Sequence, residues 1–298
     1  MDRLDSIAVF VTVAERRGFI AAARRLGRSP AAVSRAVAAL EDELGLRLIN
    51  RTTRALSLTE AGESLLERGR RLLADYQDIK DALEGGGAAK GVLTVTAPVQ
   101  FGRLHIMPIV RRFLVDHPGV DINLRLLDHI APLVDEGIDV ALRIGELPDS
   151  SLLALRVGAV RRVLVASPAY IAAHGAPMRP DDLENHAFIS AFGASVTSNL
   201  LTLGPEEDRS FRFRPRLSVN SIDAGLDAAA AGLGIVRLLS YQVEAALAAG
   251  RLVRILADFE PPSVPIHLVR PAGRRPSQKV SLFIAEAAAA LRGHFDAG

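Results

Sequence analysis

The sequence predicts three parts: an N-terminal winged helix-turn-helix, a long linker helix, and a C-terminal α/β region of two subdomains. The first prediction rests on an arginine-rich stretch punctuated by helix caps, and the second on apolar residues at heptad spacing. Alternating strand and helix patterns over the last two thirds of the chain predict the third part. The chain has 298 residues, of which 49% are hydrophobic, so two or three compact units can form.

The composition excludes several classes of protein. Without any cysteine, the chain has no disulfides, thiolate metal sites or thiol redox sensing. Its net charge is only +2, so basic character is local. The N-terminal apolar run is too short for a signal peptide or a membrane span. We therefore expect a cytoplasmic protein without a membrane partner.

The basic stretch spans residues 19–54 and holds seven arginines and three acidic side chains. A polyanion is the expected partner of such a local charge. A first helix is predicted over residues 19–26, and Gly27 ends it. Ser29 and Pro30, as N-cap and first helical residue, open a second helix that Gly45 stops. Two helices joined by a short glycine turn form a helix-turn-helix.

The second helix has one apolar stripe, which consists of Val33, Val37, Leu40 and Leu44. Its opposite face carries small residues that allow a close approach to a groove, and polar groups that reach bases or phosphates. We expect this region to contact DNA through Arg28, Ser29, Pro30, Ala31, Ser34 and Arg35. The alternative is an ordinary helical hairpin whose arginines are merely solvated.

Residues 46–59 read as a two-stranded wing, with Leu46 and Leu48 on one strand and Leu56 and Leu58 on the other. The basic tip between them adds three predicted DNA contacts, Arg51, Thr52 and Arg54. An opening helix precedes the pair, with an apolar stripe of Leu4, Ile7, Ala8, Val11, Val13 and Ala14. This helix completes a winged domain over residues 1–58.

A long helix follows, capped by Thr59 and ended by the glycines at 85–87, so residues 59–87 form the linker. Its apolar residues repeat at heptad spacing along one seam. The seam is predicted to pair two chains through Leu65, Leu72, Tyr76, Ile79 and Leu83. The alternative is that this face packs against its own chain. Residues 85–91 read as a flexible hinge.

Residues 91–298 are the predicted effector domain. Strands are expected at 92–97, 120–127, 138–144, 162–167 and 266–269, and helices at 101–117, 130–136, 168–174, 221–231 and 276–294. Strands that alternate with helices favour mainly parallel sheets with helices on both faces.

Ligands of open α/β sheets bind beyond the carboxyl ends of the strands. The segments at that edge predict a pocket between the two blocks for a small effector, a carboxylate or another polar metabolite. Its expected residues are Pro98, Val99, Gln100, Phe101, Asp128, His129, Arg143, Asn220 and Ser221. Alternatives remain open: Arg143 as a structural partner of Asp139, Gln100 and Phe101 as helix cap and core residue, and His129 as a surface histidine.

Catalytic signatures are absent from the sequence, which has no GxSxG, GxxxxGK or HExxH motif, and its histidines lack metal-ligand spacing. We therefore expect no enzyme activity, no catalytic residue, no metal and no cofactor. A ligand-responsive DNA-binding regulator is favoured. An α/β enzyme or solute-binding protein that carries a helix-turn-helix is the second hypothesis.

Several motifs in order, AAARRLGRSPAAVSRAVAALEDELG, RTTRALSLTEAG, GVLTVTAPVQFGR and DVALRIG, make the chain resemble the LysR-type transcriptional regulators. One departure is that Gly18 and Ile20 flank Phe19 where the family usually has hydroxyl residues, which predicts a weak N-cap.

The resemblance implies an effector domain like the periplasmic binding proteins, with a first subdomain over 91–161 and 266–298 and a second over 162–265. It also implies promoter DNA as a partner and a homodimer that assembles into a homotetramer. We further expect RNA polymerase as a partner.

Overall fold

The computed structural model describes residues 2–51, 56–83, 89–147, 152–191, 199–204, 209–272 and 276–295. The chain divides into two compact units, Met1–Ala88 and Ala89–Gly298. Within the described ranges, no helix has the length and apolar character needed to cross a membrane.

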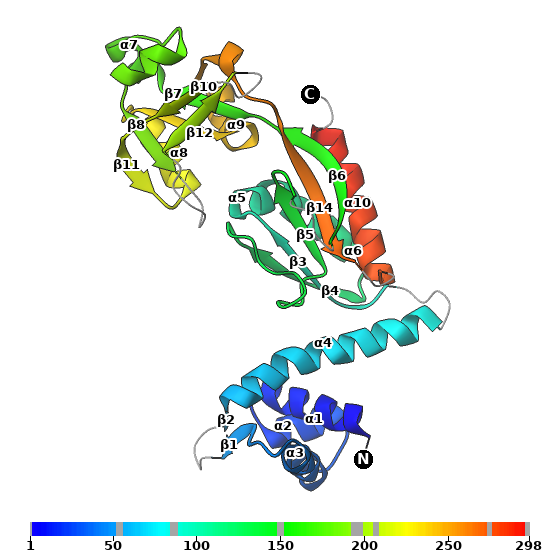
Figure 1. The fold of residues 1–298 in the computed structure, drawn as a ribbon. Coiled ribbons are helices and arrows are strands. Elements are labelled where there is room, and N and C mark those ends of the chain that lie inside the picture. Colours follow the sequence, from blue (N-terminus) through cyan, green and yellow to red (C-terminus); the bar gives the residue numbers. More distant parts are fainter. Residues whose placement is uncertain are drawn as a thin grey trace. The chain divides into compact units, whose positions relative to one another are not determined.

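The first unit is a winged helix-turn-helix followed by a long helix (Figure 1). Its elements are α1 (Arg3–Arg16), α2 (Phe19–Leu26), α3 (Pro30–Leu44), β1 (Ile49–Arg51), β2 (Leu56–Leu58) and α4 (Glu60–Leu83). Gly27 and Gly45 end α2 and α3 with φ of 63° and 67°, a conformation that favours glycine. Gly18 gives α2 no side-chain cap, so the predicted weak N-terminus is confirmed.

The core of this unit joins α1 to α3. Val33, Val37 and Leu40 of α3 are buried, as the stripe predicts, together with Val9, Phe10 and Val13 of α1. Leu44 is 45% exposed, so its place in the stripe was wrong. It lies in the last turn of α3, where Leu48 after the turn fills the core. Leu46 is also exposed, because β1 begins only at Ile49.

The helix α4 begins at a cap formed by Thr59, whose Oγ1 accepts from the Gly62 amide at 3.0 Å. Its first half packs on the core of its own unit, where Leu65 is partly buried and a Cβ on Gly69 would lie 3.0 Å from Ile7. For Leu65, the structure therefore agrees with the alternative that this face packs against its own chain. Leu72 and Tyr76 are 46% and 49% exposed. Ile79 and Leu83 lie within α4, but their side chains are outside the described part.

The second unit has two five-stranded sheets, and we call the parts built on them the first and second subdomains. In the first sheet the order is β4 (Val120–Leu126), β3 (Gly91–Ala97), β5 (Val140–Ile144), β14 (Val264–Pro271) and β6 (Leu152–Val160). In the second it is β11 (Pro215–Val219), β8 (Phe188–Ala191), β12 (Ile235–Leu239), β7 (Arg162–Ala166) and β13 (Val253–Ile255). The chain leaves the first sheet after β6 and returns with β14.

Both sheets are mixed, which corrects the expectation of mainly parallel sheets. In the first sheet β4, β3 and β5 are parallel, whereas β14 pairs antiparallel with both β5 and β6. In the second sheet β11, β8 and β12 are parallel, and β7 pairs antiparallel with both β12 and β13. The β14–β6 pair is antiparallel because β6 leads out of the first subdomain and β14 leads back into it beside β6.

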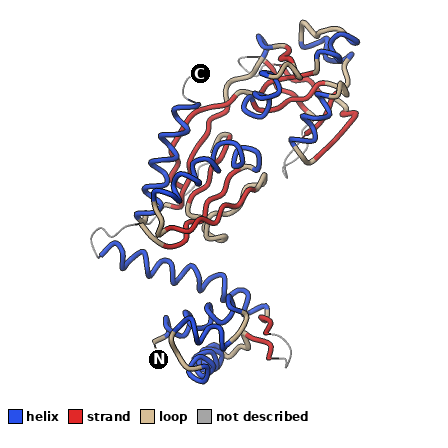
Figure 2. Tube along the Cα trace, turned by 180° about the vertical axis from the view of Figure 1, so that it is seen from behind, coloured by secondary structure: helices blue, strands red, loops and turns tan. Residues whose placement is uncertain are grey.

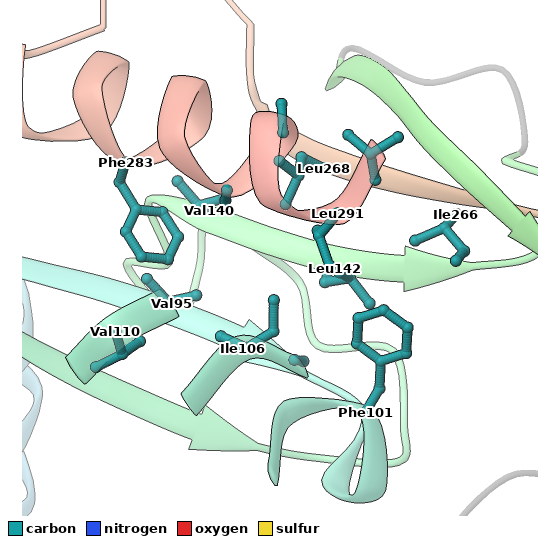
Figure 3. Packing of buried hydrophobic residues seen from close by; sticks show 14 of the residues in the cluster. Val95, Phe101, Ile106, Val110, Val140, Leu142, Ile266, Leu268, Phe283 and Leu291 are labelled. Atoms are coloured by element: carbon teal, nitrogen blue, oxygen red, sulfur yellow. The ribbon is translucent and has the colours of Figure 1, made fainter. Parts of the chain in front are cut away.

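Helices α5 (Val99–Phe101), α6 (Met107–Asp116) and α10 (Gln278–Phe295) cover the first sheet, and a π-helical segment, Gly102–Ile106, joins α5 to α6. Figure 3 shows Phe283 beside Val95 and Val140, and Phe101 and Leu291 beside Leu142. The expected helix at 130–136 was wrong: the segment is a single turn, with the Glu136 amide donating to the carbonyl of Pro132.

The second subdomain adds helices α7 (Pro168–His174), α8 (Ile222–Ala230) and α9 (Ser240–Ala248). Two 3-10 segments, Pro180–Asn185 and Ala257–Phe259, and the antiparallel pair β9 (Leu200–Leu203) and β10 (Arg209–Arg212) complete it. Figure 2 shows its strands and helices from the opposite side. Of these elements, α7 and α8 were predicted from sequence.

Candidate nucleic-acid interface and effector pocket

The outward face of α3 presents the predicted DNA contacts. Pro30, Ala31 and Arg35 are exposed and Ser34 is half-buried. Ser29 caps the helix, because its Oγ accepts from the Ala32 amide at 3.2 Å. Within the described residues, no carboxylate pairs with Arg35, so its guanidinium is available to a polyanion.

Arg28 has an intramolecular partner. Its guanidinium makes two bonds to the Asp5 carboxylate of α1, at 2.9 and 2.7 Å. The bond from Arg28 holds the pKa of Asp5 below its ordinary value. This pair connects the turn before α3 to α1, so Arg28 has a structural role. The number of charges in the sequence could not distinguish that role from a DNA contact.

The wing is fixed to α3 by the buried carboxylate of Glu41, which the sequence alone showed only as one of three acidic charges. Glu41 is 4% exposed, and its Oε1 accepts from the amides of Leu48 and Ile49 at 2.8 and 3.2 Å. Burial alone raises the pKa of Glu41, but these two bonds and the Arg47 guanidinium outweigh it, so the pKa lies below its ordinary value.

We expect Glu41→Ala to destabilise the winged unit by about 1–3 kcal/mol for each buried amide left unpaired. Hydrogen exchange at the Leu48 and Ile49 amides should accelerate, whereas Glu41→Gln, which keeps an acceptor, should have a smaller effect. Because the folded pKa is lowered, the stabilisation is complete above the ordinary value of 4.5 and is lost as the pH falls through the lowered pKa. Unchanged amide exchange in Glu41→Ala would contradict this role.

The predicted contacts at the wing tip are only partly described. The backbone of Arg51 lies at the end of β1, opposite Leu56 of β2. Its side chain, and Thr52 and Arg54 as a whole, lie outside the described residues.

A pocket of about 280 Å³ opens at the carboxyl ends of β3 and β5. It is lined by residues 96–98, 127–131 and 141–147, all from the first subdomain. The predicted effector residues among them are Pro98, Asp128, His129 and Arg143. Leu127, Ile130 and Leu147 add apolar walls, which gives the mixture of apolar surface and few polar groups that is typical of small-molecule sites.

Arg143 is the half-buried cation of this pocket. Its Nη2 donates to the carbonyl of Ala131 at 3.1 Å, and burial lowers its pKa below the ordinary value. Asp139, the proposed structural partner, accepts from the Thr94 amide at 2.8 Å. A guanidinium bonded to a neutral carbonyl retains donors for an anionic ligand.

The other predicted residues lie outside the lining of this pocket. Phe101 is fully buried in the core, with its ring 5.1 Å from that of Tyr241, so the core interpretation holds for it. Ser221 caps α8 by accepting from the Ala224 amide, and Asn220 is exposed. The Val99 amide donates to Asp128 Oδ1 at 3.0 Å.

Gln100 contacts the second subdomain rather than capping a helix. Its Nε2 donates to Oδ1 of Asp223 in the first turn of α8, at 2.9 Å. Asp223 was not predicted from sequence, because 123 positions separate it from Gln100 and no local pattern joins them. The only local signal was its place two residues after the helix cap Ser221.

Comparisons with known proteins agree with this architecture. Residues 4–63 match the family model for bacterial regulatory helix-turn-helix proteins of the lysR family, and residues 86–292 match the LysR substrate binding domain. An uncharacterized HTH-type transcriptional regulator of Haemophilus influenzae is 34% identical over 282 residues, covering 94% of this chain and 98% of that protein.

Two full-length structures are similar to the whole chain. The Vibrio cholerae virulence activator AphB shares 27% identity with a TM-score of 0.60, covering 97% of this chain and 99% of that one. CrgA from Neisseria meningitidis shares 29% with a TM-score of 0.62, covering 96% and 98%. The family consists of transcription regulators rather than enzymes. With a DNA-binding and an effector-binding part in this order, the chain belongs to the LysR family of transcription regulators.

Proposed function

We propose that the chain reads its operator through the outward face of α3 and the tip of the wing. The observation that carries this proposal is the exposed Arg35, which has no carboxylate partner among the described residues and lies one turn after the exposed small residue Ala31 on α3. The proposed contact surface also includes Ser29, Ser34, Arg51, Thr52 and Arg54. Arg28 has a lesser part, because Asp5 already binds its guanidinium.

The test is binding to operator DNA over a series of salt concentrations. Neutralised phosphates release counterions, so the affinity should fall steeply as salt rises. A chain that lacks residues 1–58 should lose this binding. If the truncated chain bound the same operator equally well, the proposed interface would be wrong.

We also propose that a small carboxylate or similar polar effector binds at the carboxyl ends of β3 and β5 and at the junction with α8. The proposed ligand contacts in the pocket are Pro98, Asp128, His129 and Arg143. At the junction they are Val99 and Gln100 of α5 and, in the second subdomain, Asn220 and Ser221 before α8. The half-buried Arg143 supports an anionic ligand, because a partly desolvated guanidinium favours a charged partner.

The effector can be sought by thermal shift with a panel of carboxylates. A ligand at 100 times its Kd stabilises the folded chain by about 2.7 kcal/mol. We expect Arg143→Ala to remove that shift while operator binding without effector persists. An undiminished shift in Arg143→Ala would return Arg143 to a purely structural role.

As an assembly, we propose a homodimer paired along α4 that forms a homotetramer and acts with RNA polymerase in the cytoplasm. Exposed Leu72 and Tyr76 on α4 support the pairing of helices. A regulator of promoter DNA has its target in the cytoplasm.

A further inference from the structure

The contact between α5 and α8 places a carboxylate of the chain itself at the proposed effector site. Gln100 is only 5% exposed, and its Nε2 donates to Asp223 Oδ1 at 2.9 Å. Arg103, in the π-helical segment that follows α5, has its Nη2 3.8 Å from the same oxygen. Asp223 belongs to the second subdomain, so one of its oxygens faces both donors that the first subdomain presents here.

The neighbouring donor is occupied in a similar way. The amide of Val99, one residue before Gln100, donates to Asp128 Oδ1 at 3.0 Å. Two consecutive residues of α5 therefore bind carboxylates supplied by other segments of the chain. The Oε1 atom of Gln100 is buried without a hydrogen-bond partner among the described residues. The Asp223 bond is thus the polar contact that orients this buried amide.

The two carboxylates differ in how they are attached. Asp128 follows β4 and belongs to the same subdomain as α5, so its bond is local. Asp223 lies in the other subdomain and its side chain is 59% exposed, so it can leave Gln100 and be solvated. A carboxylate with this freedom can be replaced by another carboxylate without leaving the buried Gln100 amide unsatisfied.

We propose that Asp223 is a tethered competitor that holds the two subdomains together when no effector is bound. The inference rests on the proposed effector site and concerns its regulation. An effector carboxylate takes the Gln100 amide and the Arg103 guanidinium, and Asp223 is released. The relative arrangement of the subdomains then changes, because the ligand binds the state without the Asp223 contact more tightly.

The test measures the distance between two spin labels, one in each subdomain of the same chain. Because the chain has no cysteine of its own, labels attach only at the two introduced cysteines. Val115→Cys on α6 and Ala172→Cys on α7 are exposed positions in the two subdomains. Spin labels there report the separation of the subdomains in the full chain, diluted with unlabelled protein so that only intrachain pairs contribute. We expect Asp223→Ala to shift or broaden the distance distribution.

Asp227→Ala is the matched control, because Asp227 is exposed one turn later on α8 and should leave the distance distribution unchanged. If Asp223→Ala also leaves the distribution unchanged, the contact does not hold the subdomains together and the inference is wrong.

A second arm tests recognition of the carboxylate. Sodium acetate at about 100 mM should shift part of the wild-type population toward the distances of Asp223→Ala, because free acetate binds weakly and competes with the Asp223 carboxylate for the Gln100 amide. Sodium chloride at the same ionic strength should not shift it. If acetate leaves the wild-type distances unchanged although Asp223→Ala has shifted them, a free carboxylate does not displace Asp223 and the inference is wrong. Neither arm uses DNA or an effector, so the inference can fail while the proposed function stands, and the reverse.

Discussion

We expect Arg35→Ala to lower the affinity for operator DNA by about 1–3 kcal/mol if the guanidinium reads a base, and to relax the preference for that base at its position in the operator. The reason is geometric: Arg35 is exposed on the face of α3 opposite Val33 and Val37, which are buried. If Arg35 binds a phosphate instead, affinity falls uniformly across operator sequences and the salt dependence becomes shallower.

The measurement is fluorescence anisotropy with the operator and with variants changed at single base pairs. Arg112→Ala is the matched control, because Arg112 is an exposed arginine of α6 in the other unit and pairs with Asp116. It removes the same charge far along the chain from α3. If Arg35→Ala and Arg112→Ala lost equal affinity for the operator, net charge would explain the effect and α3 would not be the DNA interface.

Local signals predicted the first unit well. Ser29 with Pro30 opens α3, and Gly27 and Gly45 end α2 and α3, because capping and positive φ are decided within a few residues. Glu41 was counted only among the three acidic side chains of the basic stretch, and no local signal pointed to its structural role. Its partners are backbone amides of Leu48 and Ile49, and backbone donors leave no trace in residue identity.

Sheet partners were harder to predict in the second unit. The strand β6 was missed, although it pairs along its length with β14, because its partner lies about a hundred residues later and only the pairing defines it. The single turn around Pro132 was taken for a helix because its apolar spacing fits both.

The residues of the proposed effector site also differ in how far sequence could predict them. The rule for the carboxyl ends of strands predicted Asp128, which follows β4, and Arg143, which lies near the end of β5, and both line the pocket. Asp223 was not, because its role depends on contact between two subdomains. Contacts of this kind require coordinates.

Leu72→Glu combined with Tyr76→Glu should separate the proposed dimer into monomers at micromolar concentration. Both side chains are about half exposed in the single chain and lie one turn apart on α4, a helix of 24 residues. Burial between two copies would take four unpaired carboxylates out of water, and each costs several kcal/mol or must be neutralised. Light scattering would report the mass, and a wild-type monomer at that concentration would remove the basis for the dimer.

Dissociation should also weaken operator binding far more than Arg35→Ala does. Two linked reading helices bind the two half-sites of an operator as one event, and the linkage multiplies affinity by about 10²–10⁴. A single half-site should therefore bind the charged variant and the wild type alike, whereas the full operator should distinguish them. Ser64→Glu is the control, because it adds a carboxylate to an exposed position of α4 that is not one of the seam residues. If Ser64→Glu dissociated the protein as well, general repulsion rather than the seam would explain the loss. If the double variant stayed dimeric and kept full affinity, the dimer contact would have to lie outside α4.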